Sequence, residues 1–404
     1  MREMSNYTNI EKCVVCGNSH LKPYLNLGLQ PLANSYHKGK ELPKYPLAVQ
    51  FCPECTHSML TVSVNPADMF TDYLYISDTS ETLTKYFQGL RDNICSRNPN
   101  ATSVLEIACN SGLFLEMFKD KGLKCFGVDP AANLRNLSEA RGLDVDVEFW
   151  NLDYANKISA DKKFDIICAI HVLPHVPNPV EFLQACKRVL NPGGKIYVQT
   201  SQCDMFNNGE FDAIYHEHVS YFTAGSFVRA AEENGLIVSG AWKAPIHSSS
   251  FVFEVTDHGV HGEEVIAMKN QEKQLGRDDY ESYAKFSNNA TYTKDTLVAL
   301  VDRFKADGMK VIGYGASAKG NTLLNWGKFK LDYIVDDSNF KWDYLTPGMD
   351  VPIKSPEFLY KETEPVAILC LAWNFFEEIS NNVRKNSTQK NKFITYFPCL
   401  KIEN

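Results

Sequence analysis

The sequence predicts an α/β protein with a small N-terminal zinc-binding domain, a central Rossmann-like domain and a second, C-terminal Rossmann-like domain. Three observations predict this: two C-x-x-C pairs near the N-terminus, a strand–turn–helix pattern at residues 103–118, and a similar pattern at residues 310–322. Strand–turn–helix units build doubly wound sheets, whose ligands bind at the carboxyl ends of the strands. We expect domains at residues 1–70, 71–250 and 301–404, with a strand and helical connector at residues 251–300.

Length and composition fit a globular protein of two or three domains. The chain has 404 residues, of which 44 % are hydrophobic and 22 % are charged. A formal net charge of −8 argues against a nucleic-acid partner. No apolar run is long enough to span a bilayer, and the stretch MREMSNYTNIEK lacks a signal-peptide core. We therefore expect a cytoplasmic protein without membrane association, as a monomer or a weak homo-oligomer.

Four cysteines form two C-x-x-C pairs, whereas the other eight are scattered and are interpreted as buried thiols. The four are Cys13, Cys16, Cys52 and Cys55. Two such pairs provide four thiolates for a closed tetrahedral zinc site, which stabilises a fold and leaves no position open for chemistry. A redox pair or an iron–sulfur cluster is the rival interpretation. His20 or His57, which lie nearby in the sequence, could replace one thiolate.

A segment rich in tyrosine and hydroxyl groups, residues 72–81, links this domain to the next. It opens a predicted helix, with Ser77, Asp78 or Thr79 as candidate N-caps. The same segment could close over a bound ligand. In that case Tyr73 would contact a substrate and Ser80 would contact a cofactor.

The pattern at residues 103–118 predicts the first ligand-binding turn. A dinucleotide site would need G-x-G-x-x-G here, but the turn holds a single glycine, which favours a ligand without phosphates. An acidic residue at the strand end favours a cationic ligand, and S-adenosylmethionine meets both conditions. The candidate contacts are Glu106, Ala108, Cys109, Asn110 and Gly112. A domain without a ligand is the alternative.

The following turns add candidates for the same cofactor. A second apolar run ends at Asp129 and Pro130, where a carboxylate can accept hydrogen bonds from ribose hydroxyls. A third unit ends near residue 150 and places Asn151 and Leu152 to meet an adenine ring. A continuous apolar run predicts a buried strand that ends at His171. Strand ends near residues 107, 129, 150, 171 and 200 indicate repeated βα units.

Residues 211–222 hold a dense group of potentially catalytic side chains. Tyr215, His216, Glu217, His218 and Tyr221 lie within seven residues. An imidazole tuned by a carboxylate can act as an acid or base near neutral pH, and a phenol can stabilise an oxyanion. A metal site with the H-x-H pair and the glutamate is conceivable, although no third well-spaced ligand is evident. The structural alternative is a surface helix start with chance polar residues.

The C-terminal part predicts a second nucleotide-type site. Helical stretches at residues 263–289 and 296–306 lead to a strand at 310–313 and to a near-fingerprint, Gly313-x-Gly315-x-x-Ala318. Backbone amides at this helix start could hold a diphosphate. The candidate substrate contacts are Tyr221, Gly315, Ala316, Ser317, Lys319, Asn321, Asp336, Trp373 and Asn374. A sulfonium donor in one domain and a phosphate-bearing acceptor in the other indicate a bisubstrate enzyme.

The chain resembles a known family, the three-domain sugar C-methyltransferases of deoxysugar biosynthesis. The resemblance covers essentially the whole chain, and its most specific marks are the paired cysteine knuckles and the runs Tyr215–His218 and Gly313–Asn321. In the donor loop this chain has Ala108 and Cys109 where the family usually has a glycine and a polar residue. The resemblance implies a class I methyltransferase domain in the centre, with S-adenosylmethionine and structural Zn²⁺ as cofactors. It further implies a nucleotide-linked 4-keto-6-deoxy sugar, on dTDP or GDP, that is methylated at C3 through an enolate.

The resemblance also implies catalytic roles for five residues. His218 is the leading candidate base, and Tyr215 and Glu217 are its neighbours at the sugar. His175 is a further polar group there, and Tyr75 contributes to a lid.

Three alternatives stay open. The methyl acceptor could be a sugar hydroxyl or amine. The C-terminal fingerprint could instead bind NAD(P) and make the protein a sugar oxidoreductase, which would leave residues 106–112 unexplained. A non-enzymatic zinc-bearing scaffold would leave the cluster at residues 215–221 without a role.

Overall fold

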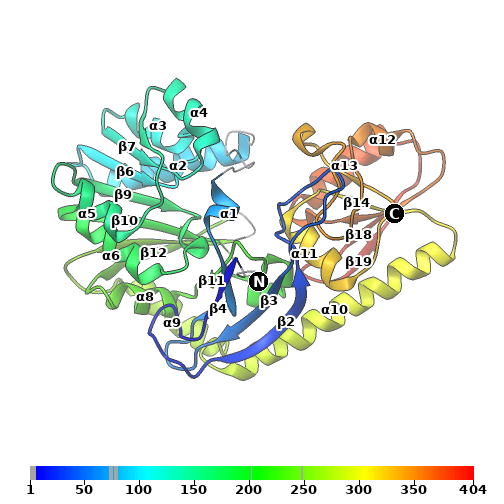
Figure 1. Cartoon of the computed structure of the whole chain (residues 1–404), viewed down its shortest axis with the longest axis horizontal. Helices are drawn as coiled ribbons and strands as arrows, with labels where there is room; N and C mark the ends of the chain where they lie inside the picture. The colour runs from blue at the N-terminus through cyan, green and yellow to red at the C-terminus, as the bar shows by residue number, and fades with distance from the viewer. Residues whose placement is uncertain (1–5, 72–75, 77–80, 202, 247–248) are drawn as a thin grey trace, which may run out of the picture.

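The computed structural model describes residues 6–71, 76, 81–201, 203–246 and 249–404. The central sheet and the C-terminal sheet form two lobes, and the N-terminal strands lie between them (Figure 1). The long helix α10 (Tyr280–Ala306) runs below the N-terminal strands to the C-terminal lobe. No helix within the described ranges has the length and apolar character needed to cross a membrane.

The central lobe contains a seven-stranded sheet of the predicted doubly wound type. Its strand order is β8-β7-β6-β9-β10-β13-β12; the first five strands are parallel, and β13 is antiparallel to both neighbours. The strands are β6 (Ser103–Ile107), β7 (Lys124–Val128), β8 (Asp144–Asp146), β9 (Phe164–Ile170), β10 (Leu190–Thr200), β12 (Ile237–Ala244) and β13 (Ser250–Thr256). The prediction that the third strand ends near residue 150 is wrong, because β8 ends at Asp146. Asn151 instead caps the following helix, α5 (Leu152–Ile158).

Helices cover both faces of this sheet. On one face, α2 (Glu81–Arg97) and α3 (Leu113–Lys119) bury Phe87, Phe114 and Phe118. On the other face lie α5, α6 (Pro179–Val189) and α8 (Ala224–Glu232). The shorter helical segments of this lobe are η2 (Ala132–Leu134), α4 (Arg135–Ala140), η3 (Leu173–His175), α7 (Met205–Asn208) and η4 (Phe211–Ala213). This covering on both sides explains the continuous apolar strands.

A strand from the central part of the chain completes the N-terminal sheet. The order is β11-β4-β3-β2, all antiparallel, formed by β2 (Lys22–Gln30), β3 (Tyr45–Phe51), β4 (Ser58–Leu60) and β11 (Ser220–Tyr221). Strand β1 (Tyr7–Asn9) pairs with β5 (Val62–Val64), and α1 (Ala67–Phe70) follows. Because β11 contains Tyr221, the last residue of the predicted catalytic cluster, this pairing ties the cluster to the N-terminal domain.

The C-terminal lobe is a second Rossmann-like domain, as predicted. Its order is β16-β15-β14-β17-β18-β19, the 3-2-1-4-5-6 order of dinucleotide-binding folds, with only β19 antiparallel. The strands are β14 (Val311–Tyr314), β15 (Ile334–Val335), β16 (Ile353–Lys354), β17 (Ala367–Cys370), β18 (Lys392–Thr395) and β19 (Lys401–Glu403). The helices are α11 (Ala318–Gly327), η5 (Asn339–Lys341), α12 (Pro356–Tyr360), η6 (Trp373–Phe375) and α13 (Phe376–Asn386).

The connector differs from the two helical stretches that the sequence predicted. Helix α9 (Glu263–Gln274) ends early, and α10 then continues without a break through residues 290–295. Asp279 caps α10 by accepting a hydrogen bond from the Glu281 amide. Leu297 and Val301 continue the buried face begun by Phe286, so packing carries the helix through a polar stretch.

Candidate active site

The two cysteine knuckles converge into one four-sulfur cluster. The Sγ atoms of the predicted ligands Cys13, Cys16, Cys52 and Cys55 all lie within 4.8 Å of one another. The Val15 amide and the Asn18 side-chain amide donate hydrogen bonds to two of these sulfurs. A four-thiolate set of this size suits tetrahedral zinc. Neither histidine belongs to the cluster, because His57 is buried against the Ser220 hydroxyl and His20 is exposed.

The first turn of the central sheet is held in a strained backbone conformation. Ala108, Asn110 and Gly112 have φ values of 56°, 51° and 82°. The Asn110 and Ala131 amides donate to the two carboxylate oxygens of Asp129, each at 2.8 Å. Left-handed backbone at non-glycine residues is typical of functional sites. The predicted residues Asp129 and Asn110 are therefore brought together at the carboxyl edge, with Pro130 following Asp129.

Glu106 lies beneath this turn as a buried acid. Only 5 % of the residue is exposed, and its Oε2 has no hydrogen-bond partner among the described residues. Burial, with Asp129 nearby, raises the pKa of Glu106 well above its usual range. The Cys109 side chain points into the core, where its sulfur would collide with a Cβ on Gly127. A buried acceptor without a partner fits the cationic end of S-adenosylmethionine.

The ends of β9 and β10 hold the predicted residue His171 together with polar groups, Tyr86, Gln199 and Thr200, that the sequence analysis did not single out. His171 has a φ of 59°, and its amide donates to the Gln199 carbonyl. Tyr86 donates to Gln199 Oε1 at 2.9 Å, while Gln199 Nε2 and Thr200 Oγ1 are buried without a described partner. Gln199 and Thr200 could have been identified as candidates from the sequence, because they lie at the carboxyl end of a predicted strand.

The predicted adenine contacts also have structural roles. Asn151 accepts a hydrogen bond from the Tyr154 amide as the N-cap of α5, and the Leu152 amide faces Glu181 at 3.3 Å. The predicted residues Tyr73, Tyr75 and Ser80, and the candidate caps Ser77, Asp78 and Thr79, lie outside the described residues.

The predicted cluster after residue 211 forms a Tyr–His pair. His218 Nδ1–H donates to the Ala213 carbonyl at 2.8 Å, and the Tyr215 hydroxyl lies 3.0 Å from His218 Nε2. A carbonyl can only accept, so His218 carries its proton on Nδ1 and Nε2 accepts from the phenol. The ring centroids of Tyr215 and His218 are 4.0 Å apart. The alternative of a surface helix start is wrong, since Ala213 and His218 are buried.

His175 joins this cluster from the central sheet. It lies in η3, directly after β9, and its Nδ1–H donates to the Glu217 carbonyl at 2.7 Å. Its ring centroid is 5.0 Å from that of His218. Burial lowers the pKa of His175, which favours the neutral ring. The cluster therefore lies at the carboxyl edge of the sheet, on the side of the predicted donor turn.

The remaining members of the cluster face the N-terminal domain. Glu217 Oε1 accepts from the Asn34 side chain at 2.6 Å, and His216 Nε2 donates to the Pro46 carbonyl. Burial lowers the pKa of His216 to about 4. The H-x-H metal site is not formed, because among the described residues only the four cysteines gather as metal ligands. Tyr221 is buried in β11, with its centroid 6.5 Å from that of His218.

The first turn of the C-terminal domain is tightly built. Gly315 has a φ of 91°, and a Cβ there would lie 2.5 Å from that of Ala372. Asp336 accepts from the Ala316 amide at 2.7 Å, and Ser317 caps α11. The Ala316 carbonyl accepts from the Tyr36 hydroxyl and from Lys341 Nζ, so an N-terminal residue reaches this turn.

Other predicted substrate residues divide between the surface and the domain contact. Lys319 Nζ lies 4.5 Å above the Trp373 ring, with its side chain partly exposed. Asn374 is exposed. The amide of Asn321 is buried and donates to the Ala33 carbonyl, so this side chain serves a contact with the N-terminal domain.

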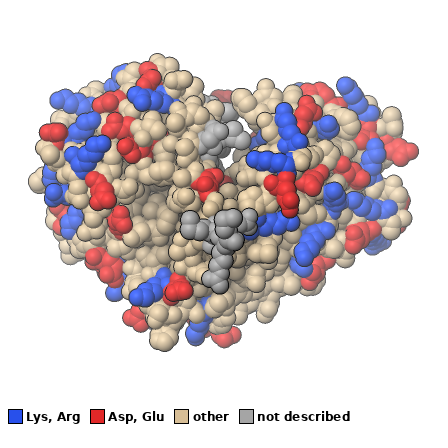
Figure 2. Space-filling model, viewed as in Figure 1, with Lys and Arg blue, Asp and Glu red and all other residues tan. Residues whose placement is uncertain are grey.

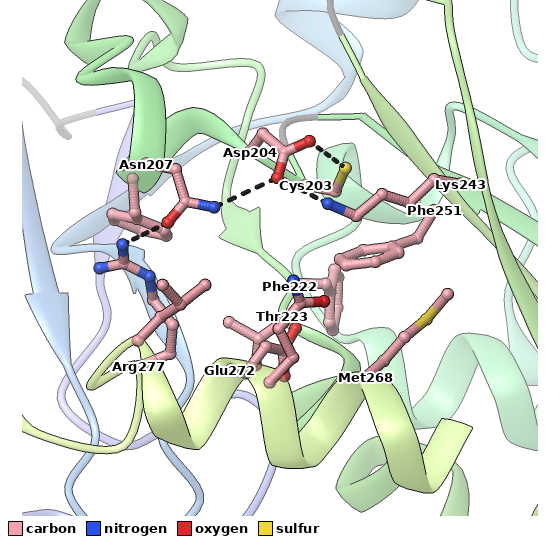
Figure 3. Close-up of a pocket in the computed structure, with 13 residues that line it drawn as sticks. Cys203, Asp204, Asn207, Phe222, Thr223, Lys243, Phe251, Met268, Glu272 and Arg277 are labelled. Carbon is pink, nitrogen blue, oxygen red and sulfur yellow. Dashed lines mark hydrogen bonds and ion pairs between the residues drawn. The ribbon is translucent and has the colours of Figure 1, made fainter. Parts of the chain in front are cut away.

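Figure 2 shows the surface hollowed between the two lobes. A separate small cavity of about 30 Å³ lies above α9, and its lining includes Asp204, Lys243 and Glu272 (Figure 3). None of the predicted site residues lines it.

Three families match the chain in order. They are a predicted zinc binding domain (residues 13–70), a methyltransferase domain (residues 78–239) and a C-methyltransferase C-terminal domain (residues 246–398). The C-methyltransferase NovU of Streptomyces niveus is 28 % identical over 96 % of this chain and 96 % of its own length. A ubiquinone biosynthesis O-methyltransferase of Nitrobacter winogradskyi is 30 % identical, over 37 % of this chain and 65 % of its own length.

Solved methyltransferase structures resemble part of the chain. An S-adenosylmethionine-dependent methyltransferase from Clostridium acetobutylicum covers 45 % of this chain and 94 % of its own, with 13 % identity and a TM-score of 0.37. The family matches, by contrast, follow one another along nearly the whole chain and coincide with the cysteine cluster and the two Rossmann-like sheets. The chain therefore belongs to the three-domain C-methyltransferases, S-adenosylmethionine-dependent enzymes with a zinc-binding N-terminal domain and a central class I methyltransferase domain.

Proposed function

We propose that this enzyme methylates C3 of a nucleotide-linked 4-keto-6-deoxy sugar through an enolate. The observation that carries the proposal is the partly buried Tyr215–His218 pair, joined by His175 at the carboxyl edge of the methyltransferase sheet. Carbon methylation needs a base for a C–H proton, whereas a hydroxyl or amine acceptor needs little more than positioning. The named C-methyltransferase relative, which aligns over nearly the whole chain, supports the same reaction class.

The donor site would be formed by residues from four strand ends. Glu106 offers its carboxylate to the ammonium group of S-adenosylmethionine, and Asp129 offers its remaining acceptor capacity to the ribose hydroxyls. Gln199 and Thr200, together with His171, line the edge between donor and acceptor. The bound cofactor supplies an electrophilic methyl group on a sulfonium sulfur.

Proton removal would fall to His218. The C3 proton moves to the lone pair of Nε2, the C–H electrons form a C3–C4 double bond, and the carbonyl π electrons move onto the C4 oxygen to give the enolate. C3 of the enolate then forms a bond to the methyl carbon of the donor as the methyl–sulfur bond breaks. Tyr215, once it turns from Nε2, can donate its hydroxyl hydrogen to that oxygen. Neutral His175 has its Nδ1 proton committed to Glu217, so it is better suited to accept a proton than to stabilise the oxyanion.

The nucleotide would lie on the C-terminal lobe. Lys319 and Lys341 flank the start of α11, a ten-residue helix capped by Ser317. Lysine charges and a helix N-terminus together favour a diphosphate. The Trp373 ring beside Lys319 offers a surface for a base or sugar.

The test is incubation with S-adenosylmethionine and a dTDP-4-keto-6-deoxyhexose, or its GDP counterpart, in deuterated buffer. We expect a gain of one methyl group, and deuterium at C3 of unreacted sugar. A methyl gain without C3 exchange would favour a hydroxyl or amine acceptor. Neither methyl gain nor exchange with either nucleotide, despite S-adenosylhomocysteine binding, would contradict the proposed substrate.

A further inference from the structure

Asp212 lies at the contact between the catalytic segment and the C-terminal lobe. It is fully buried in η4, and its Oδ2 accepts hydrogen bonds from Trp373 Nε1 at 2.8 Å and from the Tyr396 hydroxyl at 2.9 Å. Its Oδ1 has no hydrogen-bond partner among the described residues. Burying a carboxyl group is costly, so a residue placed in this way points to a role beyond packing.

The neighbouring residues are held by the same lobe. The Ile214 carbonyl accepts from Thr322 Oγ1 of α11 at 3.1 Å. The Phe211 ring packs edge-on against Trp326 and Phe397, with centroids 5.1 and 5.3 Å away. The C-terminal lobe therefore contacts the residues on both sides of Ala213.

Ala213 itself contacts the catalytic pair. Its carbonyl accepts the Nδ1 proton of His218, five residues further along the chain. The tautomer of a neutral imidazole is set by the hydrogen bond that its other nitrogen makes. With Asp212 and Ile214 both fixed, the Ala213 peptide has little freedom to turn this carbonyl away.

We propose that the C-terminal lobe positions the catalytic base: Asp212, held by Trp373 and Tyr396, fixes the Ala213 carbonyl that keeps His218 in its Nδ1–H tautomer. Asp212 is a positioning residue that acts through Ala213 and touches no reacting atom. The inference rests on the proposed function only in taking His218 as the base; the tautomer itself is a property of the protein without substrate.

The first test is the ¹⁵N NMR spectrum of histidine-labelled protein, with the His218 signals assigned by their loss in His218→Asn. We expect Nδ1 to carry the proton in the parent protein. Asp212→Ala and Tyr396→Phe should shift His218 toward the Nε2–H form or an exchanging mixture. Asp212→Asn, which keeps an acceptor for both donors, should restore the parent tautomer. An unchanged Nδ1–H signal in Asp212→Ala and in Tyr396→Phe would overturn the proposal.

The second test separates positioning from folding and from the choice of substrate. In Asp212→Ala we expect kcat with the keto sugar to fall at least 10-fold, while the KM for donor, the zinc content and the affinity for S-adenosylhomocysteine stay within 2-fold. Arg384→Ala, which removes an exposed ion pair of the same lobe, is the control. If no keto sugar is methylated by the parent protein, the proposed function fails while the NMR test still decides the tautomer. If Asp212→Ala shifts the His218 tautomer but leaves kcat unchanged, the tautomer set through Asp212 does not matter for catalysis, which would contradict the proposal.

Discussion

At the scale of single residues, the proposed donor site includes a carboxyl group that is costly to bury. Glu106 has one oxygen without a described partner, and its raised pKa reflects burial and the charge of Asp129. We expect Glu106→Gln to weaken S-adenosylhomocysteine binding about 10- to 100-fold, since a hydrogen bond to a charged group contributes about 1.5–3 kcal/mol. Isothermal titration calorimetry measures this, with Glu139→Gln on exposed α4 as the control. Unchanged affinity in Glu106→Gln would exclude a donor contact there.

The base is tested at the same scale. We expect His218→Asn to lower kcat by about 10²–10⁴-fold, the usual range for a lost general base, and to abolish deuterium exchange at C3. Donor affinity should not change, because the proposed donor contacts are Glu106 and Asp129 and do not include His218. His216→Asn, two residues away and hydrogen-bonded to Pro46, should retain C3 exchange. Full turnover by His218→Asn would remove His218 from the mechanism.

The pH dependence of stability follows from Asp212. Burial raises its pKa from 3.8 to about 6, so between these values the folded protein binds more protons than the unfolded chain. The contribution of protonated Asp212 to the free energy of unfolding is therefore fully present below about pH 4 and is lost as the pH rises through 6. We expect Asp212→Asn to remove this decline, which chemical denaturation at pH 4.5 and pH 7 would measure. If the free energy of unfolding falls equally between pH 4.5 and pH 7 in the parent protein and in Asp212→Asn, a group other than Asp212 causes the fall.

At the scale of elements, strand β11 links the zinc knuckles to the segment that carries His218. It pairs with β4, and His57, two residues after Cys55, hydrogen-bonds to the Ser220 hydroxyl at 3.1 Å. We expect zinc removal to lower the Tm by about 10 °C or more, because structural zinc contributes several kcal/mol to folding. Exchange at C3 should be lost, whereas S-adenosylhomocysteine binding below the new Tm should persist. Exchange at the parent rate after verified zinc loss would contradict this coupling.

The elements also show what the sequence can predict. The cysteine pairs and the βα units are local signals, so the zinc cluster, both Rossmann-like sheets and the residues of the donor turn follow from spacing and periodicity. Strand β11 has two residues and no periodicity, and it pairs with a strand some 160 residues away. The contact between Asp212 and Trp373 is equally remote in sequence. Long-range packing decides such features, which no local pattern encodes.

At the scale of the whole molecule, the N-terminal domain joins the two lobes. Its knuckle cysteines pack into the core of the central lobe, while Leu25 and Phe51 of its sheet pack with the C-terminal core. Under the proposed function the donor site is on the central lobe and the nucleotide site is on the C-terminal lobe, with the N-terminal strands between the two lobes (Figure 1). This arrangement predicts that each substrate is recognised by its own lobe and that the two meet only at the cluster.

Two substitutions, one on each lobe, test this separation. We expect Lys319→Ala to raise the KM for the nucleotide sugar about 10-fold, as loss of a charged phosphate contact would, without changing S-adenosylhomocysteine affinity. We expect Glu106→Gln to weaken S-adenosylhomocysteine binding without changing the KM for the nucleotide sugar. Because the two side chains share no described partner, their effects on kcat/KM should add within about 0.5 kcal/mol in the double variant. A coupling energy well above 1 kcal/mol would instead show that donor and nucleotide are bound by one cooperative site, with closure of the lobes as its physical basis.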